Sequence, residues 1–140
     1  IFNTYGKNMQ INDGRVISNF IRQNLKGEPL TIYGDGSQTR SFCFIDDLLE
    51  GMIKLMDSSY VKPINLGSDE EIDINNLCDL IRHQINPSIK KIQRPLPEGD
   101  PTIRRPDLRR AANILNWKPK TKLKQGLEFT INSFKEVIRN

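Results

Sequence analysis

The residues of this chain with the clearest chemical potential are polar side chains placed where an apolar segment ends. Asn3, Thr4 and Tyr5 offer an amide, a hydroxyl and a phenol directly after Ile1 and Phe2, which we expect to be the last residues of a buried strand. In open α/β sheets, ligands bind beyond the carboxyl ends of the strands. The pattern therefore predicts a ligand site at this strand end.

Several arginines stand at the ends of predicted elements and are candidates for anion binding. Arg40 follows the glycine-rich turn 34–37 and opens an apolar strand, where a guanidinium can fork onto a diphosphate. Arg104 and Arg105 stand in a proline-rich loop and can close on an anion. Arg15 opens a helix, where its charge opposes the helix dipole, and this unfavourable placement favours a ligand nearby. Each of them can also be a solvated surface arginine, and spacing alone leaves that choice open.

Other kinds of catalytic equipment cannot be found in the sequence. A single histidine leaves no scope for a histidine-cluster metal site, so we predict no metal ion. The turn Gly34-Asp35-Gly36 has too few glycines for a dinucleotide fingerprint. None of the three tyrosines is followed four residues later by lysine, so a Tyr-x-x-x-Lys pair is also missing. On its own, this chain lacks the usual groups for redox and acid–base chemistry.

The elements that must position these groups alternate between helices and strands, which predicts an α/β chain. Asp46 and Asp73 are predicted helix N-caps. Apolar periodicity predicts helices over 14–25, from Asp46 to 56, from Asp73 to 85, from Asp107 to 115 and over 122–138, with strands at 30–33, 40–45, 63–67 and 89–93. Four prolines between 95 and 106 exclude a regular helix there. No stretch has linker composition, so residues 1–140 are expected to form part of one domain.

Composition narrows the class of protein without fixing it. The net charge of +4 is compatible with a nucleic-acid surface, a solvated basic face, or arginines that hold the phosphates of a small ligand. Cys43 and Cys78 stand inside apolar patterns, which predicts two buried free thiols in a reducing compartment. No apolar run approaches the roughly 18 residues of a membrane span. We therefore predict a globular chain.

Several motifs, taken together and in order, are those of a known family. They are Ile-Phe-Asn-Thr-Tyr-Gly (1–6), Asp-Gly-Arg-Val-Ile-Ser-Asn-Phe-Ile (13–21), Gly-Glu-Pro-Leu-Thr-Ile-Tyr-Gly-Asp-Gly-Ser-Gln-Thr-Arg-Ser-Phe (27–42), Asp-Asp-Leu (46–48), Pro-Ile-Asn-Leu-Gly (63–67), Arg-Arg-Pro-Asp-Leu (104–108) and Leu-Asn-Trp-Lys-Pro (115–119). In this combination the chain resembles the C-terminal portion of the UDP-glucuronate decarboxylases, also called UDP-xylose synthases. These are extended short-chain dehydrogenase/reductases of the NAD-dependent epimerase/dehydratase family. The run Gln-Thr-Arg-Ser-Phe (38–42) is the motif most specific to the decarboxylase branch.

The resemblance implies a fold and a set of site residues. The fold is the C-terminal part of an NAD(P)-binding Rossmann-like fold, with its nucleotide-sugar-binding subdomain. Arg104 matches an arginine near the sugar carboxylate or the phosphates and is the candidate catalytic residue of this chain. The other substrate-binding candidates are Asn3 at the sugar and diphosphate, Val16 and Tyr33 beside the uracil, Arg40 on the diphosphate, and Gln38 and Arg15. Thr4, Gln10 and Arg15 are the cofactor-binding candidates, at the edge where NAD and the substrate meet.

The implied activity is the NAD-dependent conversion of UDP-glucuronate to UDP-xylose. In the family, C4 of the sugar is oxidised by NAD, the resulting β-keto acid loses CO₂, and the hydride is then returned. The glycine-rich loop and the Tyr-x-x-x-Lys pair would lie in an N-terminal NAD-binding half that is absent from the given sequence. This chain would supply the UDP-sugar side and would be inactive alone.

Two alternatives stay open. One is a sister activity on the same scaffold, a nucleotide-sugar 4,6-dehydratase or 4-epimerase. The other is a non-catalytic basic module that binds nucleic acid, whose affinity would fall steeply with salt. If the chain is part of a decarboxylase, we expect it to bind a UDP-sugar and to form a homodimer when full length. We expect it to bind no nucleic acid, and we expect no membrane contact in this segment. The expected location is cytoplasmic, or the Golgi if an upstream segment carries an anchor.

Overall fold

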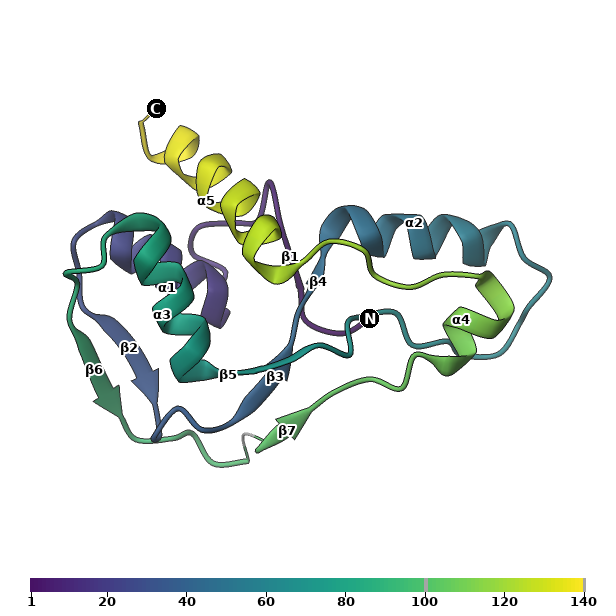
Figure 1. Cartoon of the computed structure of the whole chain (residues 1–140), viewed down its shortest axis with the longest axis horizontal. Coiled ribbons are helices and arrows are strands. Elements are labelled where there is room, and N and C mark those ends of the chain that lie inside the picture. The colour runs from purple at the N-terminus through teal and green to yellow at the C-terminus, as the bar shows by residue number, and fades with distance from the viewer. Residues whose placement is uncertain (100, 140) are drawn as a thin grey trace.

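The strands form small separate sheets rather than one continuous sheet (Figure 1). The computed structural model describes residues 1–99 and 101–139. Within these residues, β1 (Thr4–Tyr5) pairs in parallel with β4 (Cys43–Phe44), and β2 (Leu30–Tyr33) pairs in parallel with β6 (Lys91–Arg94). The third sheet has β3 (Thr39–Ser41) at its centre, antiparallel to β5 (Glu71–Asp73) and parallel to β7 (Ile103–Arg104).

The helices gather at two ends of the molecule around two apolar clusters (Figure 1). At one end, α1 (Val16–Leu25), α3 (Ile74–Ile85) and α5 (Leu123–Arg139) pack on one another. Their apolar faces form the larger cluster, which includes Phe20, Leu77 and Phe134. At the other end, α2 (Ile45–Met56) packs on α4 (Arg109–Leu115), with Trp117 in the smaller cluster.

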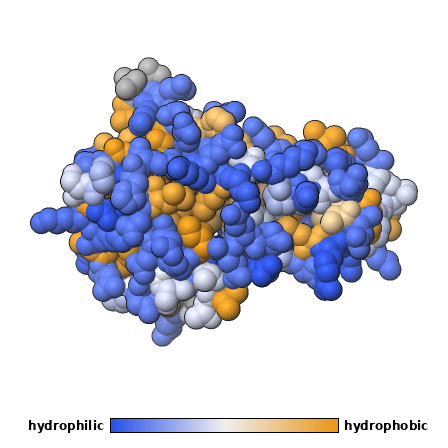
Figure 2. Space-filling view, in the orientation of Figure 1, coloured by the Kyte–Doolittle hydropathy of each residue, from blue (hydrophilic) through white to orange (hydrophobic). Residues whose placement is uncertain are grey.

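The outer side of α2 keeps apolar side chains in solvent. Leu49, Ile53 and Met56 recur at helical spacing and are 47%, 58% and 81% exposed. Figure 2 shows a mostly hydrophilic face that apolar atoms interrupt in several places, including along α2. None of the helices in residues 1–99 and 101–139 has the length and apolar character needed to cross a membrane.

Several predicted elements are confirmed. The helix predicted over 14–25 is α1, and the strand predicted at 30–33 is β2. Asp73 caps α3 as expected, because its carboxylate accepts the backbone N–H of Asn76 at 2.8 Å. Cys43 and Cys78 are buried free thiols, and burial raises their pKa values to about 12 and about 11. Both thiols are therefore un-ionised at neutral pH and poor nucleophiles.

Two strand predictions are wrong: the strand expected to end at residues 1–2, and the single strand expected at 40–45. Ile1 is 71% exposed, and the strand lies instead at Thr4–Tyr5. Asn3 has a φ of 26°, outside the β region, so a strand cannot run through it. Residues 40–45 form two strands because the chain changes partners at Phe42, from β5 and β7 to β1.

Two further local predictions are corrected. Residues 63–67 form no strand, although the carbonyl of Leu66 accepts the N–H of Phe2 at 3.0 Å. Asp46 is not the N-cap of α2, because the helix begins at Ile45 with Phe44 in the capping position. Asp46 and Asp47 stand in the first turn, where their charges favour the helix dipole.

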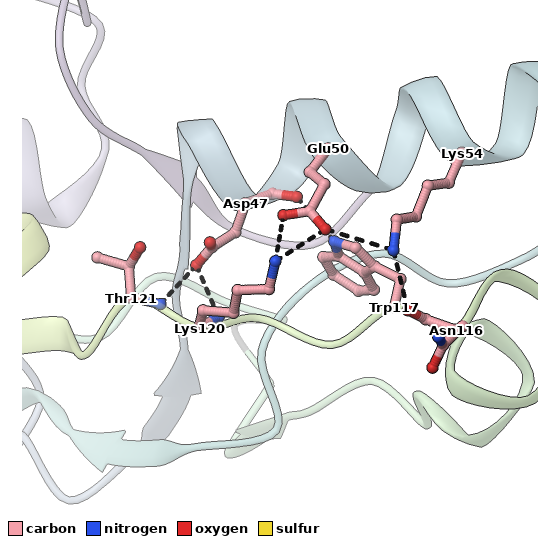
Figure 3. A network of polar contacts seen from close by, with 7 residues as sticks. All are labelled: Asp47, Glu50, Lys54, Asn116, Trp117, Lys120 and Thr121. Carbon is pink, nitrogen blue, oxygen red and sulfur yellow. Dashed lines mark hydrogen bonds and ion pairs between the residues drawn. The ribbon is translucent and has the colours of Figure 1, made fainter.

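A polar network ties α2 to the segment that joins α4 to α5 (Figure 3). The carboxylate of Asp47 accepts the backbone N–H groups of Lys120 and Thr121, at 3.0 and 2.8 Å. The indole Nε1 of Trp117 donates to the backbone carbonyl of Asp47 at 2.9 Å. The ammonium of Lys120 pairs with Glu50 at 2.7 Å. The network fixes where the chain turns back toward the larger cluster.

We predict that Asp47→Ala lowers the free energy of unfolding by about 2 kcal/mol, because it leaves two partly buried backbone N–H groups without an acceptor. Urea denaturation followed by circular dichroism measures the change. Asp46→Ala is the matched control, since that side chain is 61% exposed and its ion pair with Lys7 spans 3.8 Å. Equal losses in the two variants would contradict this role for Asp47.

Candidate nucleotide-sugar site

A cavity of about 470 Å³ lies between the start of α1 and the strands β1, β2 and β3. Its size falls within the range of roughly 300–1,000 Å³ that is usual for small-molecule sites. Predicted site residues from three separate motifs line it, namely Asn3, Thr4, Arg15, Val16, Tyr33, Gln38 and Arg40. The fold therefore brings most of the predicted site residues together.

Asn3 and Thr4 form the β1 side of the cavity. The side-chain amide of Asn3 donates to the backbone carbonyl of Ser41 at 3.0 Å. The backbone carbonyl of Asn3 accepts the N–H of Cys43 at 3.1 Å. These bonds hold Asn3 in its left-handed conformation, which asparagine tolerates better than most residues. The hydroxyl of Thr4 is buried and has no hydrogen-bond partner among the described residues. An unsatisfied buried hydroxyl at a cavity is a natural contact for a ligand.

Tyr5 lines the same cavity but is held by the protein. Its hydroxyl lies 3.4 Å from the carbonyl of Leu123, and its ring packs edge-on against Phe42 and Phe44. Burial, followed by nearby anionic groups, raises the pKa of this phenol above its ordinary value. Tyr5 therefore joins β1 to α5 as a neutral side chain, rather than serving as an acid or base.

Arg15 is placed at the edge of the cavity by contacts of three of its nitrogen atoms with Thr4 and Asp13. Its Nη1 donates to the carbonyl of Thr4 at 2.9 Å, and its Nε donates to the carboxylate of Asp13 at 2.7 Å. The Nη2 atom lies 2.5 Å from the same carboxylate oxygen. The guanidinium is therefore oriented although the side chain is 57% exposed.

Tyr33 ends β2 and Arg40 lies in β3, and Gln38 stands between the turn 34–37 and β3. Gln38 donates to the carbonyl of Tyr33 at 2.8 Å, which closes the turn, and the Tyr33 side chain is 46% exposed at the cavity. Arg40 is only 8% exposed and donates to the carbonyl of Thr39 at 2.8 Å. Arg104 is its in-register neighbour on the parallel strand β7. In-register residues of adjacent strands share a face, so two cationic side chains stand side by side.

Two predicted residues do not line the cavity. Gln10 is exposed in the loop before α1, and Arg104 is exposed on β7. The predicted roles of both residues stay predictions.

Sequence reasoning missed part of the cavity wall. Phe20, Phe42 and Ile74 supply apolar surface, and the loop between β6 and β7 contributes Pro97, Glu98 and Gly99. The only feature of the sequence that could have indicated this loop is its position, because a segment that joins two separated strands must cross the space between them.

The chain is similar to known proteins over most of its length. Residues 1–67 match the model of the NAD dependent epimerase/dehydratase family. The chain is 48% identical over 99% of its length to UDP-glucuronic acid decarboxylase 4 of Arabidopsis thaliana, and 46% identical over its whole length to UDP-glucuronic acid decarboxylase 1 of Danio rerio. It spans only 31% and 34% of the length of these relatives.

Solved structures show the same fold. The UDP-glucose 4-epimerase of Thermotoga maritima superposes with a TM-score of 0.93 at 25% identity, over 98% of this chain and 45% of that one. The UDP-glucuronic acid 4-epimerase of Bacillus cereus, in complex with UDP-glucuronic acid and NAD, superposes with a TM-score of 0.90 at 28% identity, over 97% and 44%. The fold is thus the Rossmann-like α/β fold of the NAD-dependent epimerases, as predicted. Within it, the chain is similar over almost its whole length to UDP-glucuronic acid decarboxylases and corresponds to about a third of their length.

The turn 34–37, which precedes Gln38 and Arg40, leads to a prediction about stability. Gly36 has a φ of +78°, and a Cβ built there would stand 2.6 Å from the side chain of Asn75, which donates to the carbonyl of Asp35. We expect Gly36→Ala to lower the free energy of unfolding by about 2–4 kcal/mol, from backbone strain plus the clash. Thermal denaturation measures it.

Gly27→Ala is the matched control for backbone strain alone. Gly27 has a φ of +71°, and nothing lies within 4 Å of its built Cβ. We expect this variant to lose only about 1 kcal/mol. Similar losses in both variants would show that Asn75 moves aside without cost.

Proposed function

We propose that this chain is the UDP-sugar side of an NAD-dependent decarboxylase that converts UDP-glucuronate to UDP-xylose. The observation that carries the proposal is the convergence of Asn3, Arg15, Tyr33 and Arg40 on one cavity, although they are widely separated in the sequence. The similarity to UDP-glucuronic acid decarboxylases over the whole chain supports the same activity.

The task of these residues is to bind and orient the nucleotide. Arg40 and Arg15 supply cationic N–H groups for the diphosphate, and charge-assisted bonds of this kind are stronger than neutral ones. The partly exposed ring of Tyr33 offers a flat apolar surface for the uracil. Asn3, fixed between β1 and β3, places its amide at the sugar end. Holding the sugar in one orientation lowers the entropic part of the reaction barrier.

Arg104 is proposed to bind the sugar carboxylate or the phosphates beside Arg40. Arg104 is the in-register neighbour of Arg40 on β7, and a dianionic diphosphate or a carboxylate carries the negative charge that such cationic side chains bind. A carboxylate held in this way is oriented for loss of CO₂ once C4 carries a ketone. The proton chemistry is assigned to residues outside this chain.

The residues present fit one edge of an NAD molecule. Thr4 offers a buried hydroxyl that has no partner within residues 1–99 and 101–139, and Arg15, which bonds to the carbonyl of Thr4, stands beside it. These two side chains would hold the cofactor edge, while Gln10 lies outside the cavity. When bound, NAD supplies the acceptor and donor of the hydride.

We also propose the domain context. Residues 1–140 are the C-terminal portion of one domain whose NAD-binding half is carried elsewhere in the full polypeptide, as their partial match to longer relatives supports. The apolar stripe of α2 provides a surface that such a half can cover. The homodimer and the cytoplasmic location belong to the same proposal.

The direct test of function uses the complete polypeptide that carries this chain. It is incubated with UDP-glucuronate and NAD⁺, and the product is followed by mass spectrometry. We expect a UDP-pentose that has lost CO₂. A product with the mass of the substrate but a new sugar would favour the second candidate, a 4-epimerase, which the superposition on the Bacillus cereus enzyme supports. Unchanged UDP-glucuronate, with turnover of UDP-glucose or dTDP-glucose, would favour a different sister activity.

Arginine variants of that polypeptide test the assigned roles. We expect Arg40→Lys to weaken UDP binding about tenfold, because lysine keeps the charge but loses the fork, and Arg104→Ala to lower the turnover of UDP-glucuronate. Isothermal titration and steady-state kinetics measure these changes. Arg109→Ala is the control, since that side chain is 88% exposed and lies outside the cavity. Unaltered UDP affinity in Arg40→Lys would remove Arg40 from the diphosphate.

A further inference from the structure

Asp13 is a partly buried carboxylate that stands behind Arg15 and is not itself part of the cavity lining. One of its oxygens accepts the backbone N–H of Arg15 at 2.9 Å and the hydroxyl of Ser18. The other accepts Nε of Arg15 at 2.7 Å and lies 2.5 Å from Nη2. The side chain of Asp13 is only 14% exposed, whereas that of Arg15 is 57% exposed. A sheltered anion therefore holds an exposed cation.

The contacts of Arg15 determine which of its hydrogens remain for a ligand. A guanidinium has five N–H groups. Asp13 uses those on Nε and Nη2, and the carbonyl of Thr4 uses one on Nη1. One N–H on each terminal nitrogen is left, and both belong to a group that lines the cavity. Two N–H groups on one guanidinium can bind an oxyanion by charge-assisted hydrogen bonds.

Asp13 remains ionised at neutral pH, as this role requires. Burial raises the pKa of its carboxyl, but the hydrogen bonds from Ser18 and from Arg15, together with the charge of Arg15, outweigh burial and hold the pKa below its ordinary value. The negative charge also offsets the charge of Arg15 at the start of α1, where a cation alone is unfavourable.

The same Asp-x-Arg motif, with an aspartate bonded to the arginine two residues later, occurs a second time in the chain, away from this cavity. Asp107 accepts the backbone N–H and Nε of Arg109, both at 3.0 Å, and lies 2.5 Å from its Nη2. Arg109 is 88% exposed at the start of α4. The two pairs have similar local geometry, but Arg109 does not line the cavity that holds Asn3 and Arg40, whereas Arg15 lines it and also reaches the carbonyl of Thr4. The second pair is therefore an internal control for the local bond itself.

We infer that Asp13 is a positioning residue that acts through Arg15: it fixes the guanidinium against the carbonyl of Thr4 so that two N–H groups face the anionic part of a bound nucleoside diphosphate. The inference rests on the proposed function, which supplies the nucleotide. Asp13 does not touch the ligand. Its effect on binding must therefore disappear when Arg15 is removed.

The test is a double-mutant cycle on the complete polypeptide, with UDP as the probe and isothermal titration as the readout. Asp13→Asn keeps an oxygen for the N–H of Arg15 and the hydroxyl of Ser18, but it places an amide donor in front of the guanidinium. We expect it to weaken UDP binding about five- to tenfold in the wild-type background and by less than about twofold in the Arg15→Ala background. Asp107→Asn should change the affinity by less than about twofold.

The outcomes separate the inference from the proposed function. An equal loss from Asp13→Asn in both backgrounds, or a loss matched by Asp107→Asn, overturns the positioning role, because a purely structural effect does not depend on Arg15. Unchanged binding in Asp13→Asn overturns it as well, while the Arg40→Lys response still reports on the proposed site. A wild-type protein that does not bind UDP at all refutes both. Circular dichroism melting of each variant confirms that the compared proteins are folded.

Discussion

The carboxylate of Asp47 is the constraint on which the arrangement of the two apolar clusters depends. It accepts two consecutive backbone N–H groups in the connection between α4 and α5. The backbone carbonyl of Asp47 accepts the indole N–H of Trp117 (Figure 3). Since α2 follows β4 directly, the same residue is tied to the pairing of β4 with β1. From this anchor the chain enters α5, whose Leu127 and Phe134 belong to the larger cluster. One side chain thus sets the path between both clusters.

The cavity depends on a change of partners that the chain makes at Phe42. Upstream of it, β3 presents Arg40 between β5 and β7; downstream, β4 holds β1, from which Asn3 and Thr4 reach the same cavity. The amide of Asn3 bonds to the carbonyl of Ser41, which closes the gap between the two sheets. Cationic and polar groups are therefore positioned by backbone pairing rather than by flexible loops, which favours a preorganised site.

Local signals explain which elements were predictable from the sequence. The helices α1 and α3 follow from apolar periodicity, and the cap of α3 from Asp73. The split at Phe42 and the missing strand at 63–67 were not predictable, because each depends on which distant segment offers a partner. The family motifs carry most of the predicted site residues that line the cavity, and their roles stay predictions. Asp13 and Glu98 were missed, since nothing in a loop sequence distinguishes an aspartate behind an arginine, or a glutamate facing a cavity, from solvated charges.

The pairing of β2 with β6 has a consequence for the order of folding. Leu30 lies opposite Lys91, so this sheet joins segments about sixty residues apart, and the loop that follows β6 supplies the last wall of the cavity. Contacts of such long sequence separation form late, because the intervening chain must first lose its freedom. A nascent chain that already contains β1, α1 and β3 therefore holds Arg15 and Arg40 before the last wall of the cavity exists. That wall follows with β6 and the loop after it, and the connection between α4 and α5, which bonds to Asp47, is made later still.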